Sequence, residues 1–287
     1  MTRGRLVIVH LFPDLLNLYG DRGNVATLVQ RARWRGLDVD VRAIDETSIS
    51  GLLAADIIFI GGGPDRLQIP VARTLERAAG SLALAIADGA ALLAICGGFQ
   101  NLGDEYRSPL VGNLSGPGLF DIQTRATEGA TRLVGGVVAE LEPGSPIAAL
   151  GTRSAVAAGF GGQEQTLVGF ENHSGQTFLG WRVRSLGQVP LGHGNNGDDG
   201  GEGLLALPGE GGLTGLRVGS YLHGPLLPRN PHLADFILAS ALARRHGPEL
   251  APLDDDAEWA AHAAFAARWS PRSGRRWRPR LQRRLSL

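Results

Sequence analysis

A short apolar run ends in the chain's only cysteine and then turns at once into glycines. Residues 92–95 have the pattern of a buried strand, Cys96 follows directly, and Gly97 and Gly98 come next. Only glycine fits so sharp a strand-to-helix turn, and the turn lifts the preceding side chain out of the sheet. The pattern predicts a nucleophile elbow, in which a helix N-terminus stabilises a thiolate. The alternative is that Cys96 is a small buried hydrophobe.

The segments around this turn alternate between strand and helix patterns. Strands are predicted at residues 6–12, 38–44, 57–60 and 92–95, and helices at residues 25–35 and 71–87. This order predicts an α/β fold of the flavodoxin-like type, with a mostly parallel central sheet and helices on both faces. In such a fold, functional groups gather at the carboxyl ends of the strands.

The second half of the chain has a different pattern. From about residue 112 to 219, short apolar runs are broken by glycines, which predicts a mainly antiparallel extension of the sheet with a mobile loop across residues 192–203. A last strand is expected at residues 217–222. A helix is expected at 231–245, since proline favours a first helical turn.

The composition changes beyond Pro252, so we divide the chain into a domain at residues 1–250 and an extension at 251–287. The extension has three consecutive aspartates, an alanine-rich stretch and an arginine-dense tail with two tryptophans. Such a segment buries little apolar surface, so we expect it to be flexible or to become ordered on a partner. The tail could contact an anionic membrane surface or could simply be solvated, and the sequence leaves both interpretations open.

Composition excludes several classes of function. The 28 basic and 28 acidic residues balance, so no overall field points to nucleic acid or membrane. No stretch has the length of a membrane span, and the N-terminus leads into a strand rather than a signal peptide, which predicts a cytoplasmic protein. A single cysteine excludes an internal disulfide, and the histidines and carboxylates show no metal-ligand spacing. The chain has no lysine, which excludes Schiff-base chemistry and a Walker-type phosphate loop.

Cysteine chemistry needs a base and donors for an oxyanion. His223 follows the last predicted strand and so lies at the same edge of the sheet as Cys96, where an imidazole can accept and return a proton. His173, next to Glu171 after another strand, is the alternative base.

Glycine-rich loops at two strand ends could supply the donors. The backbone amides of Gly62, Gly63 and Gly97 are the candidates for the oxyanion hole, because glycine lets the main chain approach closely.

Four separate segments of the chain share motifs with one family. Residues 59–65, 94–103, 170–175 and 221–225 resemble, in this order, the triad-type glutamine amidotransferases of the cobyric acid synthase branch. Within that branch the chain is most similar to the glutamine-hydrolysing subunits of lipid II isoglutaminyl synthases. The resemblance covers about residues 6–245 and implies the fold of class I glutamine amidotransferases.

The resemblance also implies an activity. Cys96 would attack the side-chain amide of L-glutamine, and His223 would act as base and then as acid. The ammonia would pass to a MurT-like Mur ligase, which would bind ATP and Mg and amidate D-glutamate of lipid II to D-isoglutamine in peptidoglycan synthesis. No cofactor is expected on this chain. The arginine that binds the glutamine carboxylate would be Arg132, with Arg125 as the alternative, and Gln100 would lie near the substrate.

One departure from the family limits the expected mechanism. Many of these amidotransferases carry a glutamate two residues after the histidine, where this chain has Pro225. We therefore expect a dyad of Cys96 and His223 with no assigned third residue. The alternatives are a stand-alone cysteine hydrolase of the peptidase or deglycase type, an amidotransferase acting on another acceptor, and a non-catalytic scaffold.

Overall fold

The fold is built on a six-stranded central sheet. The computed structural model describes residues 5–45, 51–129, 131–245 and 249–269 of the 287-residue chain. Within the sheet the spatial order is β13 (Leu204–Ala206), β14 (Arg217–Ser220), β4 (Ala91–Ile95), β3 (Ile57–Ile60), β1 (Arg5–Leu11) and β2 (Asp38–Ile44). All neighbours are parallel except β13, which runs antiparallel to β14. The predicted α/β class with a mostly parallel sheet is confirmed.

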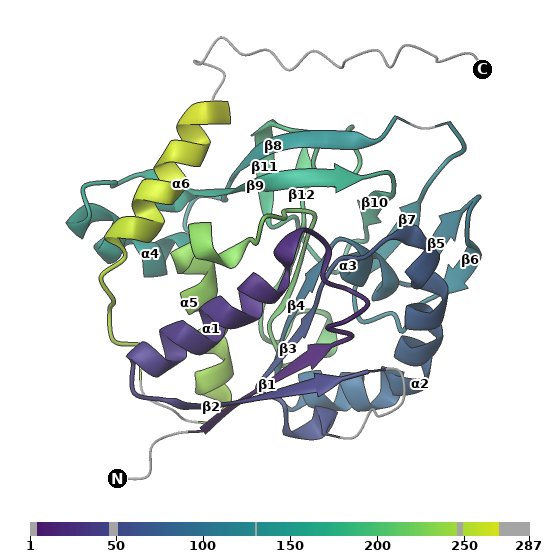
Figure 1. Ribbon diagram of the computed structural model, residues 1–287, viewed down its shortest axis with the longest axis horizontal. Helices are drawn as coiled ribbons and strands as arrows, with labels where there is room; N and C mark the ends of the chain where they lie inside the picture. Colours follow the sequence, from purple (N-terminus) through teal and green to yellow (C-terminus); the bar gives the residue numbers. More distant parts are fainter. Residues whose placement is uncertain (1–4, 46–50, 130, 246–248, 270–287) are drawn as a thin grey trace.

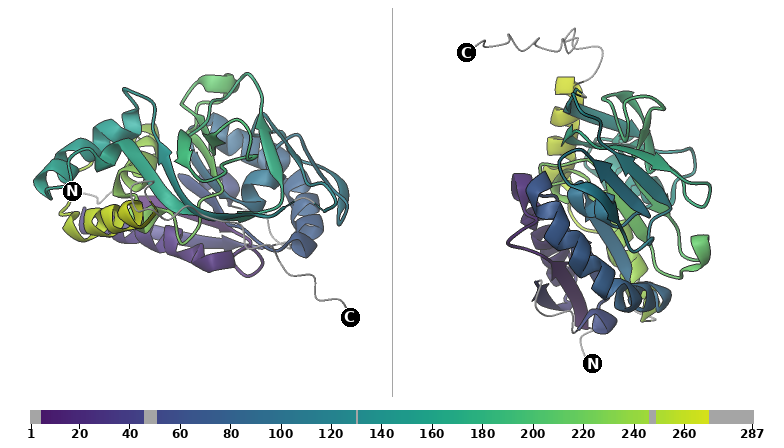
Figure 2. Two further views of the ribbon diagram at one scale, coloured as in Figure 1. Left: turned by 90° about the horizontal axis from the view of Figure 1, so that it is seen from above. Right: turned by 90° about the vertical axis from the view of Figure 1, so that its right-hand side faces the viewer.

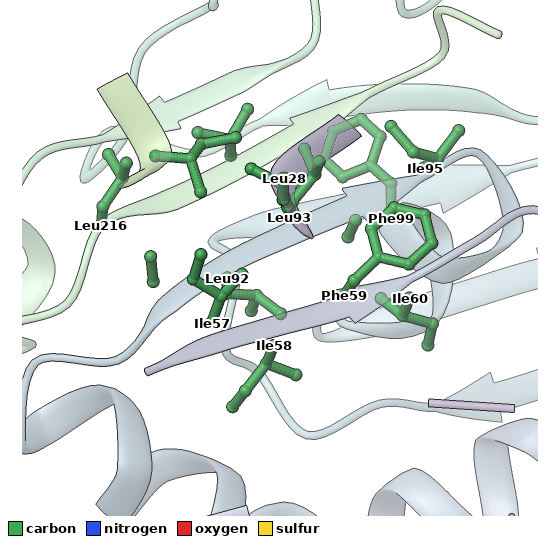
Figure 3. Packing of buried hydrophobic residues seen from close by; sticks show 14 of the residues in the cluster. Leu28, Ile57, Ile58, Phe59, Ile60, Leu92, Leu93, Ile95, Phe99 and Leu216 are labelled. Atoms are coloured by element: carbon green, nitrogen blue, oxygen red, sulfur yellow. The ribbon is translucent and has the colours of Figure 1, made fainter. Parts of the chain in front are cut away.

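Helices cover the central sheet on both sides, which explains why its inner strands are apolar throughout. Helices α1 (Arg22–Trp34) and α5 (Pro231–Arg244) pack together, and α2 (Gln68–Ala87) lies across the sheet from them (Figure 1). Every residue of β3 and β4 is buried. Their side chains meet the ring of Phe99 at one end of the cluster (Figure 3). Strands buried on both faces have continuous rather than alternating hydrophobicity.

The register of the inner strands brings three functional segments to one edge. Ile60 at the end of β3 pairs with Ala94, and Ser220 at the end of β14 pairs with Ile95. The residues that follow are therefore neighbours at the carboxyl edge of the sheet. These are the Gly61–Gly63 loop, Cys96 and the segment leading to His223.

The antiparallel part forms mainly two further sheets rather than the predicted extension of the central sheet. One contains β10 (Gln176–Leu179), β7 (Ile122–Arg125), β5 (Glu105–Ser108) and β6 (Gly112–Ser115), and the other contains β12 (Gly201–Glu202), β11 (Gly187–Leu191), β8 (Leu133–Glu140) and β9 (Thr166–His173). In both views of Figure 2 these teal and green strands lie to one side of the purple and blue part. Only β13 extends the central sheet antiparallel.

A helix that the sequence analysis missed lies among these strands. Helix α4 (Pro146–Ala157) begins with Ser145, whose hydroxyl accepts a hydrogen bond from the Ile147 amide, and has Pro146 in its first turn. Serine followed by proline is a recognised helix start, so the signal was present in the sequence. No helix in the described ranges has the length and apolar character needed to cross a membrane.

The loop at residues 192–203, predicted to be mobile, is held by hydrogen bonds. The carboxylate of Glu171 accepts from the amides of His193 (2.9 Å) and Gly194 (2.9 Å). The buried Asn195 side chain bonds both the amide and the carbonyl of Gly203, at 2.7 and 2.8 Å. The prediction was wrong because glycine-rich composition does not reveal buried side chains that bind the backbone.

The expectation of a flexible extension is wrong for its helical part. Residues 256–269 form helix α6 (Asp256–Trp269), shown in yellow in Figure 1, which packs on β8, β9 and α4. Trp259 is 0 % exposed and donates its indole N–H to the Ser154 hydroxyl at 3.0 Å. A few large aromatic side chains anchor a helix that is otherwise rich in alanine. The arginine-dense tail beyond residue 269 lies outside the described residues. Membrane contact and a solvated tail therefore both stay predictions.

We predict that Trp259→Ala lowers the free energy of unfolding by about 3–5 kcal/mol, because it removes a fully buried indole and leaves a cavity. Trp181, which is 91 % exposed, provides the matched control. Trp181→Ala should change the free energy by no more than about 0.5 kcal/mol in the same urea titration. Equal effects of the two substitutions would show that α6 is not packed against the domain.

Candidate active site

Cys96 lies on a strained turn between β4 and the five-residue helix α3 (Gly97–Asn101). Its backbone has φ 47° and ψ −105°, a conformation that non-glycine residues rarely adopt. The Cys96 amide donates to the carbonyl of Ser220 at 2.8 Å, and the Gly98 amide donates to that of Gly61 at 3.1 Å. Neighbouring strand ends thus hold the elbow in place. The side chain is 6 % exposed.

His223 lies beside Cys96, with Gly62 between them. A Cβ built on Gly62 would lie 2.8 Å from His223 Cε1 and 3.1 Å from Cys96 Cβ, so no larger residue fits there. Two backbone hydrogen bonds to Phe170 of β9 fix the histidine, since its amide donates at 2.8 Å and its carbonyl accepts at 3.3 Å. The thiol is close enough to interact with the imidazole. The described residues provide no other hydrogen-bond partner for His223 Nε2, so this nitrogen is available to the thiol.

Asp21 is a third member of this group that the sequence analysis missed. Its Oδ1 lies 3.4 Å from His223 Nδ1, and its Oδ2 accepts the Gly62 amide at 2.7 Å. The carboxylate is fully buried at the start of α1 but does not cap that helix. The expected dyad is therefore joined by a carboxylate from a distant part of the chain. An aspartate just before a helix usually signals a cap, so nothing in the sequence distinguished it.

The pKa of His223 reflects these neighbours. Burial alone lowers the pKa, but the negative charge of an ionised Cys96 and the hydrogen bond that the imidazole donates to Asp21 raise it, with a net rise to about 10. The imidazole is therefore able to hold a proton at neutral pH. Tyr19 packs edge-on against the imidazole, with ring centroids 5.0 Å apart, and shields it on another side.

A small cavity opens next to the Cys96 thiol. Its volume is about 170 Å³, which suits an amino acid better than the ~300 Å³ and larger pockets of drug-sized ligands. The residues that line it come from five separate loops and strand ends: Leu18, Gly63, Pro64, Asp65, Cys96, Gln100, Arg132, Asn172, His173 and Ser174. A larger groove of about 1050 Å³ lies elsewhere, between α2, α4 and α5, and has a mostly apolar lining.

The glycine amides differ in their availability as oxyanion donors. The Gly62 amide is already bonded to Asp21, so the prediction that it donates to an oxyanion is wrong. Gly63 lines the cavity, and a Cβ on Gly97 would lie 3.3 Å from the Gly63 nitrogen. The amides of Gly63 and Gly97 are thus close together beside the thiol and remain candidates for this role.

Arg132 and Gln100 both reach the cavity, whereas Arg125 does not line it. The Arg132 guanidinium lies at the rim, where it donates to the side chain of Asn172 and, at 3.0 Å, to its carbonyl. Gln100 is buried, accepts from Gln68 at 3.0 Å and donates to the Tyr221 hydroxyl at 3.1 Å. Arg125 lies over the ring of Phe178 instead, with its guanidinium carbon 5.8 Å from the centroid.

His173 and Glu171, the other polar pair, take different places. His173 lines the cavity, stacks on Tyr221 at 3.6 Å and bonds the Gly175 carbonyl through Nδ1 at 2.7 Å. Burial lowers its pKa to about 3, so it is a poor proton acceptor compared with His223. Glu171 holds the 192–203 loop, as described above. Across the described ranges there is no cluster of three or more histidine, cysteine, aspartate or glutamate residues that could hold a metal ion.

An elbow cysteine with a histidine and an aspartate, at the carboxyl edge of a mostly parallel sheet, is typical of enzymes that transfer acyl groups through a thioester. Residues 7–231 match the CobB/CobQ-like glutamine amidotransferase domain. The chain belongs to this family of glutamine amidotransferases, and the family predicted from the sequence is confirmed.

Individual relatives agree with this assignment. The chain is 38 % identical over 254 residues to the GatD subunit of lipid II isoglutaminyl synthase (glutamine-hydrolyzing) from Staphylococcus aureus strain N315. The aligned region covers 88 % of this chain and 91 % of the relative. The chain is 32 % identical over 246 residues to the subunit of the same name from Streptococcus pneumoniae strain R6, covering 86 % and 84 %. The glutaminase domain of Trypanosoma brucei CTPS with bound acivicin has a similar fold, with a TM-score of 0.51, 14 % identity, and coverage of 86 % and 96 %.

We predict that Asp21→Asn lowers the pKa of His223 below its value of about 10, because the substitution removes a negative charge beside Nδ1. NMR titration of the imidazole measures this shift. Asp14→Asn is the control, since the Asp14 side chain is 87 % exposed and pairs with Arg22 at the surface. An unchanged His223 titration in Asp21→Asn would contradict the assignment of Asp21.

The same pKa shift predicts how stability depends on pH. A pKa raised above 6.5 contributes stability that is fully present below about pH 6.5 and is lost as the pH rises through about 10. The free energy of unfolding should therefore fall over this interval, and less so in Asp21→Asn. Urea titrations at several pH values provide the measurement.

Proposed function

We propose that this chain hydrolyses L-glutamine through a Cys96 thioester and supplies the ammonia to a MurT-like ligase that amidates D-glutamate of lipid II. The observation that carries the proposal is the grouping of Cys96, His223 and Asp21 beside an amino-acid-sized cavity. The names of the two GatD relatives support the choice of lipid II isoglutaminyl synthase as the complex.

The proposed chemistry assigns one role to each group. The Cys96 thiolate attacks the side-chain amide carbon of glutamine, and the amides of Gly63 and Gly97 hold the resulting oxyanion. His223, held by Asp21, gives its proton to the departing ammonia, which leaves a glutamyl thioester. Water then attacks the thioester with His223 as base, so glutamate leaves and the thiolate and imidazolium are restored.

The cavity wall carries the two charges that an α-amino acid requires. Arg132 provides a guanidinium that can bind the α-carboxylate through two parallel hydrogen bonds. Asp65, on the same wall, provides an anion for the α-ammonium group. The Gln100 side chain, fixed by Gln68 and Tyr221, is placed to contact the substrate amide.

The ligase half of the reaction is assigned to a partner. The chain has no lysine, so it lacks the residue that usually contacts nucleotide phosphates in a Walker-type loop. ATP and Mg would therefore bind to the Mur-type subunit, together with the lipid II acceptor. An ATP-dependent partner also implies that the complex works in the cytoplasm.

The central experiment co-expresses this chain with a candidate Mur-type ligase and measures glutamate release from glutamine, with and without the ligase. We expect hydrolysis by the complex, and a loss of roughly 1000-fold or more in Cys96→Ala, because the nucleophile is removed. Free ammonia should restore lipid II amidation by the Cys96→Ala complex, which shows that the ligase is intact.

Other results of this experiment would support other functions. Failure to hydrolyse glutamine in both conditions would contradict the proposal. Hydrolysis of peptides or glycated substrates by the isolated chain would favour a stand-alone cysteine hydrolase. Glutamine-dependent amidation by the Cys96→Ala complex would leave only a scaffold role.

A pair of arginine substitutions tests substrate binding. We predict that Arg132→Leu raises the KM for glutamine by about 10- to 100-fold, the cost of losing a charged hydrogen-bonding partner, while kcat changes by only a few-fold. Arg125→Leu should leave both constants unchanged, because Arg125 does not line the cavity. Steady-state kinetics would contradict the assignment if the Arg125 variant were the one with the raised KM.

A further inference from the structure

An arginine side chain bonds the backbone of Gly224, the residue that follows His223. Arg229, at the end of a short helical turn (Leu227–Arg229), donates from Nη1 to the carbonyl of Gly224 at 2.9 Å. Gly224 has φ 107°, and a Cβ there would lie 3.1 Å from this guanidinium nitrogen and 3.3 Å from the ring of Phe170. The residue after His223 is thus clamped between Arg229 and β9.

Helix α6 in turn holds Arg229 from two directions. The ring of Phe265 lies over the guanidinium, with 5.2 Å between the guanidinium carbon and the ring centroid. His262 Nδ1 donates to the carbonyl of Arg229 at 2.7 Å, and its Nε2 lies 2.9 Å from the Thr166 hydroxyl. Burial lowers the pKa of His262 to about 4.

The N-terminal end of α6 is tied to helices α1 and α5. Asp255, directly before the helix, pairs with the buried Arg31 of α1 at 2.7 Å, and Arg31 also pairs with Asp235 of α5 at 2.7 Å. The guanidinium thus binds two carboxylates from different elements in fixed geometry. Helix α6 is therefore anchored independently of Arg229, so it can act as a rigid support for that residue.

We propose that Arg229 is a positioning residue for His223 and that helix α6 fixes the proposed catalytic base through it. The inference rests on the proposed function, because it assigns His223 the role of base. His223 is held on its own backbone by Phe170, but the following glycine has no side chain to restrain it. Without Arg229 this segment could move, and a displacement of about 1 Å at a catalytic group can cost about 100-fold in rate.

Alkylation of the Cys96 thiol tests the positioning role of Arg229 without any substrate. Cys96 is the only cysteine in the chain, so iodoacetamide reports on it alone. Its rate depends on the thiolate fraction, which a well-placed imidazolium increases at neutral pH. The titratable groups around His223 are Cys96, Asp21, Tyr19, His173 and Glu202, and none of them is altered in the variants below.

The measured quantity is the ratio of the alkylation rate at about pH 7 to that at about pH 9. We expect Arg229→Met to lower this ratio about tenfold relative to the unsubstituted chain. Arg229→Lys should restore part of it, because an ammonium can still donate to the Gly224 carbonyl. The control is Arg268→Met on the same helix. The guanidinium carbon of Arg268 lies 5.8 Å from the centroid of the Trp269 ring. Within the described part of the chain Arg268 has no hydrogen bond to residues 223–229, so this substitution should leave the ratio unchanged.

A merely structural role for Arg229 would give a different result. The thermal midpoint of unfolding would then fall in Arg229→Met while the alkylation ratio stayed at its original value, which would overturn the proposal. If Arg229→Met does not fold, Phe265→Leu and Phe265→Tyr decide the question. The leucine variant removes the ring from the guanidinium and should lower the ratio, whereas the tyrosine variant should keep it. Equal ratios in this pair would also overturn the proposal.

The outcome for Arg229 is separable from the outcome for the proposed function. A lowered alkylation ratio in a chain that does not hydrolyse glutamine would support the positioning role and reject the glutaminase. Glutamine hydrolysis with an unchanged ratio in Arg229→Met would support the glutaminase and reject the positioning role.

Discussion

The site depends on the contact between the Asp21 carboxylate and the Gly62 backbone. One oxygen of the carboxylate accepts the Gly62 amide and the other faces His223, while Cys96 also lies close to Gly62. The loop after β3, the start of α1, the elbow after β4 and the segment after β14 therefore meet at one glycine. Because Gly62 has no side chain, the cysteine and the histidine can approach each other across it.

Much of this arrangement could be predicted from the sequence, because it follows from local patterns. The continuous apolar runs of β3 and β4 indicate strands buried on both faces, and the glycines after them indicate tight turns at the same edge of a sheet. These two facts are enough to place Cys96 near the Gly61–Gly63 loop. The position of His223 after a third such strand follows by the same reasoning, and so do the family and the α/β class.

The parts that could not be predicted depend on contacts between distant residues. Asp21 is separated by 202 positions from His223, and its sequence neighbourhood is that of an ordinary helix start. The order of the 192–203 loop depends on the buried carboxylate of Glu171, which comes from another strand. Helix α6 is held by Trp259 and by the pairing of Asp255 with Arg31, whereas alanine and arginine content alone suggested a flexible segment.

Strand β9 has a consequence for how the two halves of the site work together. Phe170 in this strand bonds the backbone of His223, and Asn172, two residues further on, bonds the guanidinium of Arg132. The arginine proposed to bind the substrate and the histidine proposed to transfer the proton are therefore both held by β9, at positions two residues apart. A shift of β9 along its axis would change substrate affinity and turnover at the same time, so a backbone change in this strand affects both properties together.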